Sequence, residues 1–237
     1  MKEADWQKTG RRCLVMMAKF PEAGLVKTRL AADIGHRPAA ELYECFIRDL
    51  LQHLASDTWS FRLAISPGEK TKETASLFGH ELTQIPQRGE GLGDRMENVF
   101  HEIFGAGFEY VVLIGSDAPD LPLDFIDEAF TALADQDAVL GPSCDGGYYL
   151  VGLRRDGFRK GLFADIPWST PEVFSMQLRH FRDKGLRAYI LPPWRDIDTL
   201  ADLVALVNLA GATPFSESRT MKYLLAAGLV RHIKTVS

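Results

Sequence analysis

Short, continuous apolar runs alternate along this chain with longer stretches in which apolar residues recur at helical spacing. A run of about five apolar residues is typical of a parallel strand that is covered on both faces, and Tyr110–Ile114 is the clearest case. The stretch 42–54 instead has apolar residues every three to four positions, as expected for a helix that packs on a sheet. The alternation therefore predicts an α/β fold with a mixed, mostly parallel sheet between layers of helices.

The same patterns give the remaining elements. We expect strands at 13–18, 61–65, 82–85, 138–140, 148–153 and 188–191, and helices at 70–78, 94–104, 122–134, from 171 and from 199. The strand at 148–153 is expected to be antiparallel, because the link at 145–147 is too short for a helical crossover. No repeat or low-complexity linker divides the sequence, so we expect one domain over 11–237 after a polar extension at 1–10. A helix within 214–237 is expected to pack on the sheet or on a second subunit, which leaves a homodimer open.

Composition restricts the class of partner. The 27 basic and 32 acidic residues give a net charge of −5, which argues against a nucleic-acid polymer and leaves room for a small anion. The three cysteines lack the spacing of a metal site, so we expect reduced thiols. No apolar run approaches the roughly 20 residues that span a bilayer. We therefore expect a cytoplasmic protein.

A cationic loop follows the first expected strand. Segment 19–30 carries Lys19, Lys27 and Arg29 together with Gly24. Ligands of open α/β folds bind beyond the carboxyl ends of the strands, so this charge predicts a site for a phosphate-bearing ligand. A solvated surface cluster is the alternative.

A carboxylate follows the most hydrophobic strand. Asp117 stands three residues after Ile114, where the strand-end rule again places a ligand site. Carboxylate oxygens suit Mg²⁺ or Mn²⁺, so Asp117 is the first predicted metal ligand. The alternative is an aspartate that begins a turn or caps a helix.

A glycine-rich loop precedes the helix expected at 94–104. Gly89, Gly91 and Gly93 do not form a dinucleotide fingerprint, because Asp94 stands at the position of the required third glycine. These glycines permit a close backbone approach to a base or a phosphate, and Arg95 can add a charge-assisted bond. An ordinary flexible loop is the alternative.

Five motifs, in order, carry a resemblance to a known family. They lie at 19–30, 89–96, 115–122, 141–150 and 196–199. Over roughly residues 11–210 the chain resembles a bacterial family of GT-A-like nucleotide-diphospho-sugar transferases, the selenodomain-associated transferases or domain of unknown function 2064. More distantly, it resembles cofactor guanylyltransferases and sugar nucleotidyltransferases. The resemblance implies a single-domain, three-layer α/β/α sandwich.

The resemblance also implies a second metal ligand. Gly115 stands where an Asp-x-Asp motif would have its other acid, so Asp120 or a distant carboxylate must complete the site. In the cytidylyltransferases that the chain resembles, the aspartate before the Thr of a motif like that at 196–199 pairs with the strand-end aspartate around Mg²⁺. This implies Asp198, with Asp196 as the rival that spacing alone does not separate.

The predicted function is metal-dependent transfer from a nucleotide donor to an unidentified acceptor. Glycosyl transfer from a sugar nucleotide is preferred; the alternatives are nucleotidyl transfer with release of pyrophosphate and a non-catalytic nucleotide-binding module. The residues expected to stabilise the departing charge are Lys27 and Arg29. Those expected to bind the nucleotide are Lys19, Gly24, Gly89, Gly91, Gly93 and Arg95. The resemblance implies that the acceptor or the sugar faces Asp145, Gly146, Gly147 and Tyr148, for which a hairpin turn with core tyrosines is the alternative. Trp168 is a candidate wall of the acceptor site, and a helix cap at Ser169 or Thr170 is the alternative for its segment.

Overall fold

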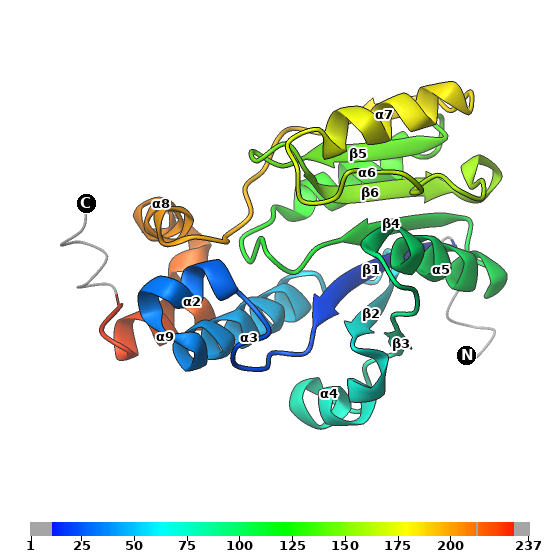
Figure 1. Cartoon of the computed structure of the whole chain (residues 1–237). Coiled ribbons are helices and arrows are strands. Elements are labelled where there is room, and N and C mark those ends of the chain that lie inside the picture. The colour runs from blue at the N-terminus through cyan, green and yellow to red at the C-terminus, as the bar shows by residue number, and fades with distance from the viewer. Residues whose placement is uncertain (1–10, 212, 230–237) are drawn as a thin grey trace.

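A computed structural model describes residues 11–211 and 213–229 as a seven-stranded sheet with helices on both faces (Figure 1). The expected extension at 1–10 and the end of the C-terminal stretch at 230–237 lie outside the described residues. The strand order is β3-β2-β1-β4-β6-β5-β7. The strands are β1 (Arg12–Lys19), β2 (Ser60–Ser66), β3 (Gln84–Pro86), β4 (Tyr110–Ile114), β5 (Ala138–Pro142), β6 (Tyr148–Arg154) and β7 (Ala188–Ile190).

The sheet is mixed and mostly parallel, as the sequence predicts. β6 pairs antiparallel with both β4 and β5, whereas the other pairs of neighbouring strands are parallel. The short link between β5 and β6 imposes this reversal. The expected strand at 110–114 is confirmed residue for residue.

Two apolar cores lie on opposite faces of the sheet. One core lies between the sheet and five helices: α2 (Thr28–Ile34), α3 (His36–His53), α6 (Leu123–Ala132), α8 (Leu200–Ala210) and α9 (Arg219–Ala226). The other core lies between the sheet and α5 (Leu92–Gly105) and α7 (Val173–Asp183). Helix α4 (Thr71–Phe78) lies beside β3. Leu14 and Met16 of β1 belong to the first core and Cys13 and Val15 to the second, which explains why this strand is apolar without alternation.

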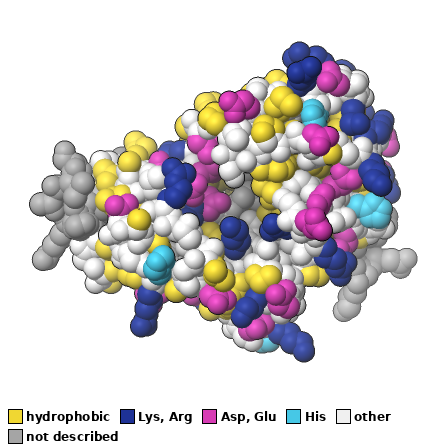
Figure 2. Space-filling view, viewed as in Figure 1, with side chains coloured by type: hydrophobic (Ala, Val, Ile, Leu, Met, Phe, Trp, Pro, Cys, Tyr) yellow, Lys and Arg dark blue, Asp and Glu magenta, His cyan; other side chains and the backbone are white. Residues whose placement is uncertain are grey.

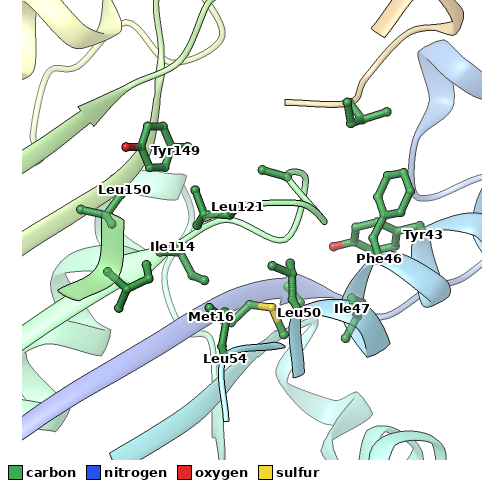
Figure 3. Packing of buried hydrophobic residues seen from close by; sticks show 14 of the residues in the cluster. Met16, Tyr43, Phe46, Ile47, Leu50, Leu54, Ile114, Leu121, Tyr149 and Leu150 are labelled. Atoms are coloured by element: carbon green, nitrogen blue, oxygen red, sulfur yellow. The ribbon is translucent and has the colours of Figure 1, made fainter. Parts of the chain in front are cut away.

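The first core extends beyond the ends of the central strands. Figure 3 shows Tyr43 and Phe46 projecting from α3 into the cluster that also contains Met16 of β1. Both rings are buried. Figure 1 shows α2, α3, α8 and α9 gathered at the side of the molecule where β1 ends. These helices therefore pack together next to the carboxyl edge of the sheet.

The helices depart from expectation at two places. The seven-residue α2 has no counterpart in the sequence analysis, because it buries only Leu30 and Ala31 and so carries little apolar periodicity. The C-terminal α9 packs on α3, where the buried carboxylate of Asp49 accepts the backbone N–H groups of Arg219 (2.8 Å) and Thr220 (2.9 Å). Among the described residues, no helix has the length and apolar character needed to cross a bilayer.

Candidate active site

A cavity of about 770 Å³ opens over the carboxyl ends of β1 and β4. Its walls come from the end of β1 and the loop after it, the segment after β4, the start of α5, and the segments 143–151, 168–173 and 196–198. Figure 2 shows a hollow in the middle of this face, with Lys and Arg side chains along one edge and apolar side chains along another. The volume is that of a pocket for a nucleotide-sized ligand.

Lys27 lies between two carboxylates at the charged end of the cavity. Its Nζ pairs with Asp117 and donates to Asp198 Oδ1 (2.8 Å) and to the backbone carbonyl of Ile197 (2.7 Å). These three contacts match the three N–H donors of an ammonium group. The Lys27 side chain is 3% exposed, whereas those of Asp117 and Asp198 are 43% and 42% exposed. The structure thus brings together three predicted residues that are far apart in the sequence.

The surrounding backbone and rings hold Lys27 in place. It is the N-cap of α2 at φ 48°, a left-handed conformation that is uncommon for any residue other than glycine. Its ammonium lies 5.7 Å from the ring centroids of both Tyr43 and Phe46. The Tyr43 hydroxyl shares a 2.6 Å hydrogen bond with Ser116 Oγ and accepts the Lys19 N–H at 3.1 Å. The ends of β1 and β4 are therefore tied to α3 around the Lys27 side chain.

The charges in this cluster shift one another's pKa values. Burial lowers the pKa of the Lys27 ammonium, but the charges of Asp117 and Asp198 outweigh it and raise the pKa above its ordinary value. Burial, followed by the charges of Asp117 and Asp198, raises the pKa of Asp196 to about 7, against the opposing effect of Lys27. Asp196 and Asp198 both line the cavity, but the ion pairs of Lys27 go to Asp117 and Asp198.

Asp120 holds the two carboxylate-bearing segments together. It pairs with Arg195 and accepts the indole N–H of Trp194 at 3.4 Å. Nearby, the Ile197 N–H donates to the carbonyl of Asp117 at 2.9 Å. Burial raises the pKa of Asp120, and the Arg195 charge opposes this rise. Asp120 does not line the cavity, so its contacts position the site from outside it.

Replacing Asp120 with Asn tests this support. We expect Asp120→Asn to lower the free energy of unfolding by about 2 kcal/mol, because the half-buried Arg195 guanidinium loses its counter-charge. Urea unfolding measures the loss. Asp127→Asn, which alters an exposed carboxylate on α6, is the matched control and should change stability by less than about 0.5 kcal/mol. Equal stabilities for the two variants would contradict the assignment.

Three further predicted cations line the cavity. Lys19 and Arg29 are exposed, whereas Arg95 is half-buried and donates to Ser66 Oγ and to the Gly91 carbonyl, both at 3.3 Å. They come from the end of β1, from α2 and from α5. The cationic loop is therefore a wall of the cavity and not only a solvated surface cluster.

The glycines predicted to bind the nucleotide do not line the cavity. This holds for Gly24, Gly89, Gly91 and Gly93. A Cβ at Gly93 would lie 2.4 Å from the carbonyl oxygen of Phe163, so the close approach that this glycine permits is to the protein's own backbone. That packing sets the start of α5 against the loop that carries Trp168. From α5, the side of the cavity is formed by Leu92, Arg95 and Met96 instead.

One wall of the cavity is aromatic. Tyr148 and Trp168 lie edge to face with ring centroids 6.1 Å apart, and both line the cavity with Asp145 and Gly147. Burial raises the pKa of Asp145, but hydrogen bonds to its Oδ1 from Ser143 Oγ (2.5 Å) and the Gly147 N–H (3.0 Å) bring it below its ordinary value. This wall of the cavity therefore presents a carboxylate and two rings to a ligand.

One residue near the end of a strand has no counterpart in the sequence analysis. Gln87 follows β3 directly and lines the cavity, and its side-chain amide donates to the carbonyls of Ala18 (3.2 Å) and Ala64 (2.8 Å). The strand-end rule that found Asp117 could have found it. Tyr149 of β6 also lines the cavity, and its hydroxyl donates to the Pro192 carbonyl at 2.9 Å. Its ring is the second of the two tyrosine rings in segment 145–149, which the resemblance associates with the acceptor or the sugar.

The mixed sheet and the charged cavity beyond its central strands define a nucleotide-diphospho-sugar transferase fold. A family profile described as an uncharacterized protein conserved in bacteria, DUF2064, matches residues 50–170. The crystal structure of a protein from Desulfovibrio desulfuricans G20, provisionally named a nucleotide-diphospho-sugar transferase, is 34% identical, with a TM-score of 0.89 over 95% of this chain and 97% of that one. The chain belongs to the DUF2064 family, as its motifs predict.

More distant structures share the fold. The inositol-1-phosphate CTP transferase of T. maritima is 14% identical, with a TM-score of 0.53 over 87% of this chain and 96% of that one. The 4-diphosphocytidyl-2C-methyl-D-erythritol synthase of Anaerococcus prevotii DSM 20548 is 10% identical, with a TM-score of 0.57 over 86% of this chain and 99% of that one. No curated protein matches the chain. The GT-A-like sandwich is thus confirmed as the fold.

Proposed function

We propose that this chain transfers a glycosyl group from a nucleotide-diphospho-sugar to an acceptor, in a metal-dependent reaction. The observation that carries the proposal is the meeting of Asp117 and Asp198 at Lys27, in a cavity of about 770 Å³. Ligands of open α/β sheets bind at this edge. The provisional name of the 34% identical relative supports a sugar nucleotide as the donor.

The two carboxylates fit a metal that binds together with the donor. No three His, Cys, Asp or Glu side chains in residues 11–211 and 213–229 are arranged to hold a metal ion by themselves. Mg²⁺ commonly takes one or two carboxylates and completes its shell with substrate phosphates and water. Asp117 and Asp198, both partly exposed, suit this role for Mg²⁺ or Mn²⁺. When bound, the ion supplies electrostatic stabilisation of the charge that develops on the diphosphate.

The cations divide into two groups. Lys19, Arg29 and Arg95 line the cavity and are placed to bind the diphosphate of the donor. Lys27 has its three donors committed to the protein, so its role is to fix the two carboxylates and not to contact the leaving group. The expected stabilisation of the departing charge therefore falls to Arg29. Asp145, Tyr148 and Trp168 then face the sugar or the acceptor.

Nucleotidyl transfer is the second candidate. Gly115 stands where an Asp-x-Asp motif would have its other acid. The two carboxylates therefore come from separate segments of the chain. Of the proteins that share the fold, one is named an inositol-1-phosphate CTP transferase and another a 4-diphosphocytidyl-2C-methyl-D-erythritol synthase. In that reaction the leaving group is pyrophosphate and the bond broken is at the α-phosphorus.

Thermal unfolding with a panel of ligands tests the proposal. We expect a sugar nucleotide with Mn²⁺, at about 100 times its Kd, to raise the Tm by roughly 5 to 10 °C, because it binds only the folded chain. The same sugar nucleotide should be slowly hydrolysed to a nucleoside diphosphate. Pyrophosphate release from a nucleoside triphosphate would favour nucleotidyl transfer. Binding without turnover of either ligand would indicate a non-catalytic module, and no binding at all would overturn the proposal.

A further inference from the structure

The Lys27 ammonium pairs with one oxygen of each carboxylate that would hold the metal. Its Nζ pairs with Oδ1 of both Asp117 and Asp198. A divalent ion held by the same pair would lie within a few ångströms of this positive charge. In a partly buried cluster, repulsion between like charges at that separation is large. The ammonium and the ion therefore compete for the same negative charge.

Lys27 has little freedom to withdraw. The Ile197 carbonyl accepts its third N–H, and the rings of Tyr43 and Phe46 flank the ammonium at 5.7 Å. Only 3% of its side chain is exposed. A metal ion that binds alone is therefore repelled by an ammonium that stays close to it, and this repulsion weakens its binding. A diphosphate brings negative charge of its own and offsets that repulsion.

We propose that Lys27 is an internal counter-ion that prevents Asp117 and Asp198 from holding a divalent metal until a diphosphate-bearing ligand is present. The inference rests on the proposed function for its metal and its donor, and it adds an order of binding. Metal and diphosphate then strengthen each other's binding, because such coupling between two ligands is reciprocal. A free metal ion does not load the site, and the carboxylates stay paired in the unliganded chain.

Mn²⁺ binding to the full-length chain, followed by the paramagnetic resonance of free Mn²⁺, tests this order. We expect Lys27→Met to bind Mn²⁺ alone at least about tenfold more tightly than the unaltered chain. Adding Asp117→Asn to Lys27→Met should abolish that gain. In the unaltered chain, inorganic pyrophosphate should tighten Mn²⁺ binding by more than it does in Lys27→Met, after correction for Mn²⁺ held by free pyrophosphate.

Two further variants serve as controls. Lys19→Met removes a positive charge from the same cavity without touching either carboxylate, and its affinity for Mn²⁺ alone should stay within about twofold of the unaltered chain. Lys27→Gln keeps an N–H donor for the Ile197 carbonyl and should show the same gain as Lys27→Met, so it carries the test if the methionine variant fails to fold.

The outcomes separate this inference from the proposed function. Unchanged affinity for Mn²⁺ alone in both Lys27 variants, with pyrophosphate-dependent Mn²⁺ binding in the unaltered chain, would overturn the counter-ion role and leave the metal-dependent function standing. An equal gain in Lys19→Met would also overturn it, as a general effect of charge. Failure of the unaltered chain to bind Mn²⁺ with pyrophosphate or with any sugar nucleotide would overturn both.

Discussion

Asp117→Asn is expected to lower kcat/KM by about a hundredfold or more and to remove the Mn²⁺-dependent part of nucleotide binding. The amide keeps the shape of the carboxylate but loses the charge that would hold the metal. Lys27 keeps its pairing with Asp198 and its bond to Ile197, so the fold should survive. Titration with a sugar nucleotide, with and without Mn²⁺, measures the loss directly.

Matched substitutions show whether the loss is specific. Asp198→Asn should reproduce it, because Asp198 is the other carboxylate at Lys27. Asp124→Asn, at an exposed position on α6 outside the cavity, should leave both measurements unchanged. If Mn²⁺-dependent affinity persists in Asp117→Asn, Asp117 is not a metal ligand and the strand-end argument fails at this site.

The strand-end rule explains why part of the site could be predicted. It depends on local apolar runs, which the sequence displays, and on the tendency of parallel strands to end at one edge. The runs predict β1 and β4, and the rule then points to the cationic loop that contains Lys27 and to Asp117. Asp198 follows only from a resemblance of motifs. No local pattern shows that it meets a lysine 171 positions away.

Other features depend on packing that the sequence does not display. A glycine permits close approach, but its neighbours in space decide what approaches it. Gly93 faces the Phe163 backbone and not a ligand. The short α2 likewise forms at the left-handed Lys27, where tertiary contacts to Asp117 and Asp198 hold a backbone conformation that local preference disfavours.

Gly146→Ala is expected to lower the free energy of unfolding by about 3 kcal/mol, with a Tm lower by roughly 6 to 12 °C. Gly146 has φ 90°, and a Cβ there would lie 2.3 Å from the carbonyl oxygen of Pro171. The carbonyl of Gly146 also accepts the Phe174 N–H at 2.9 Å, so the turn and the start of α7 cannot separate without losing this bond. Because Asp145 and Pro171 both line the cavity, the same clash should weaken donor binding.

Gly24→Ala separates the clash from the backbone conformation. Gly24 has φ 88°, almost the same as Gly146, but no atom lies within 4 Å of the position of its Cβ. Its substitution should cost only the backbone strain, about 1 kcal/mol. The difference of about 2 kcal/mol between the two variants, measured by urea unfolding, then reports the contact between Gly146 and Pro171. If both variants lose the same stability, the contact between Gly146 and Pro171 contributes nothing to stability, and the turn before β6 is not held against Pro171.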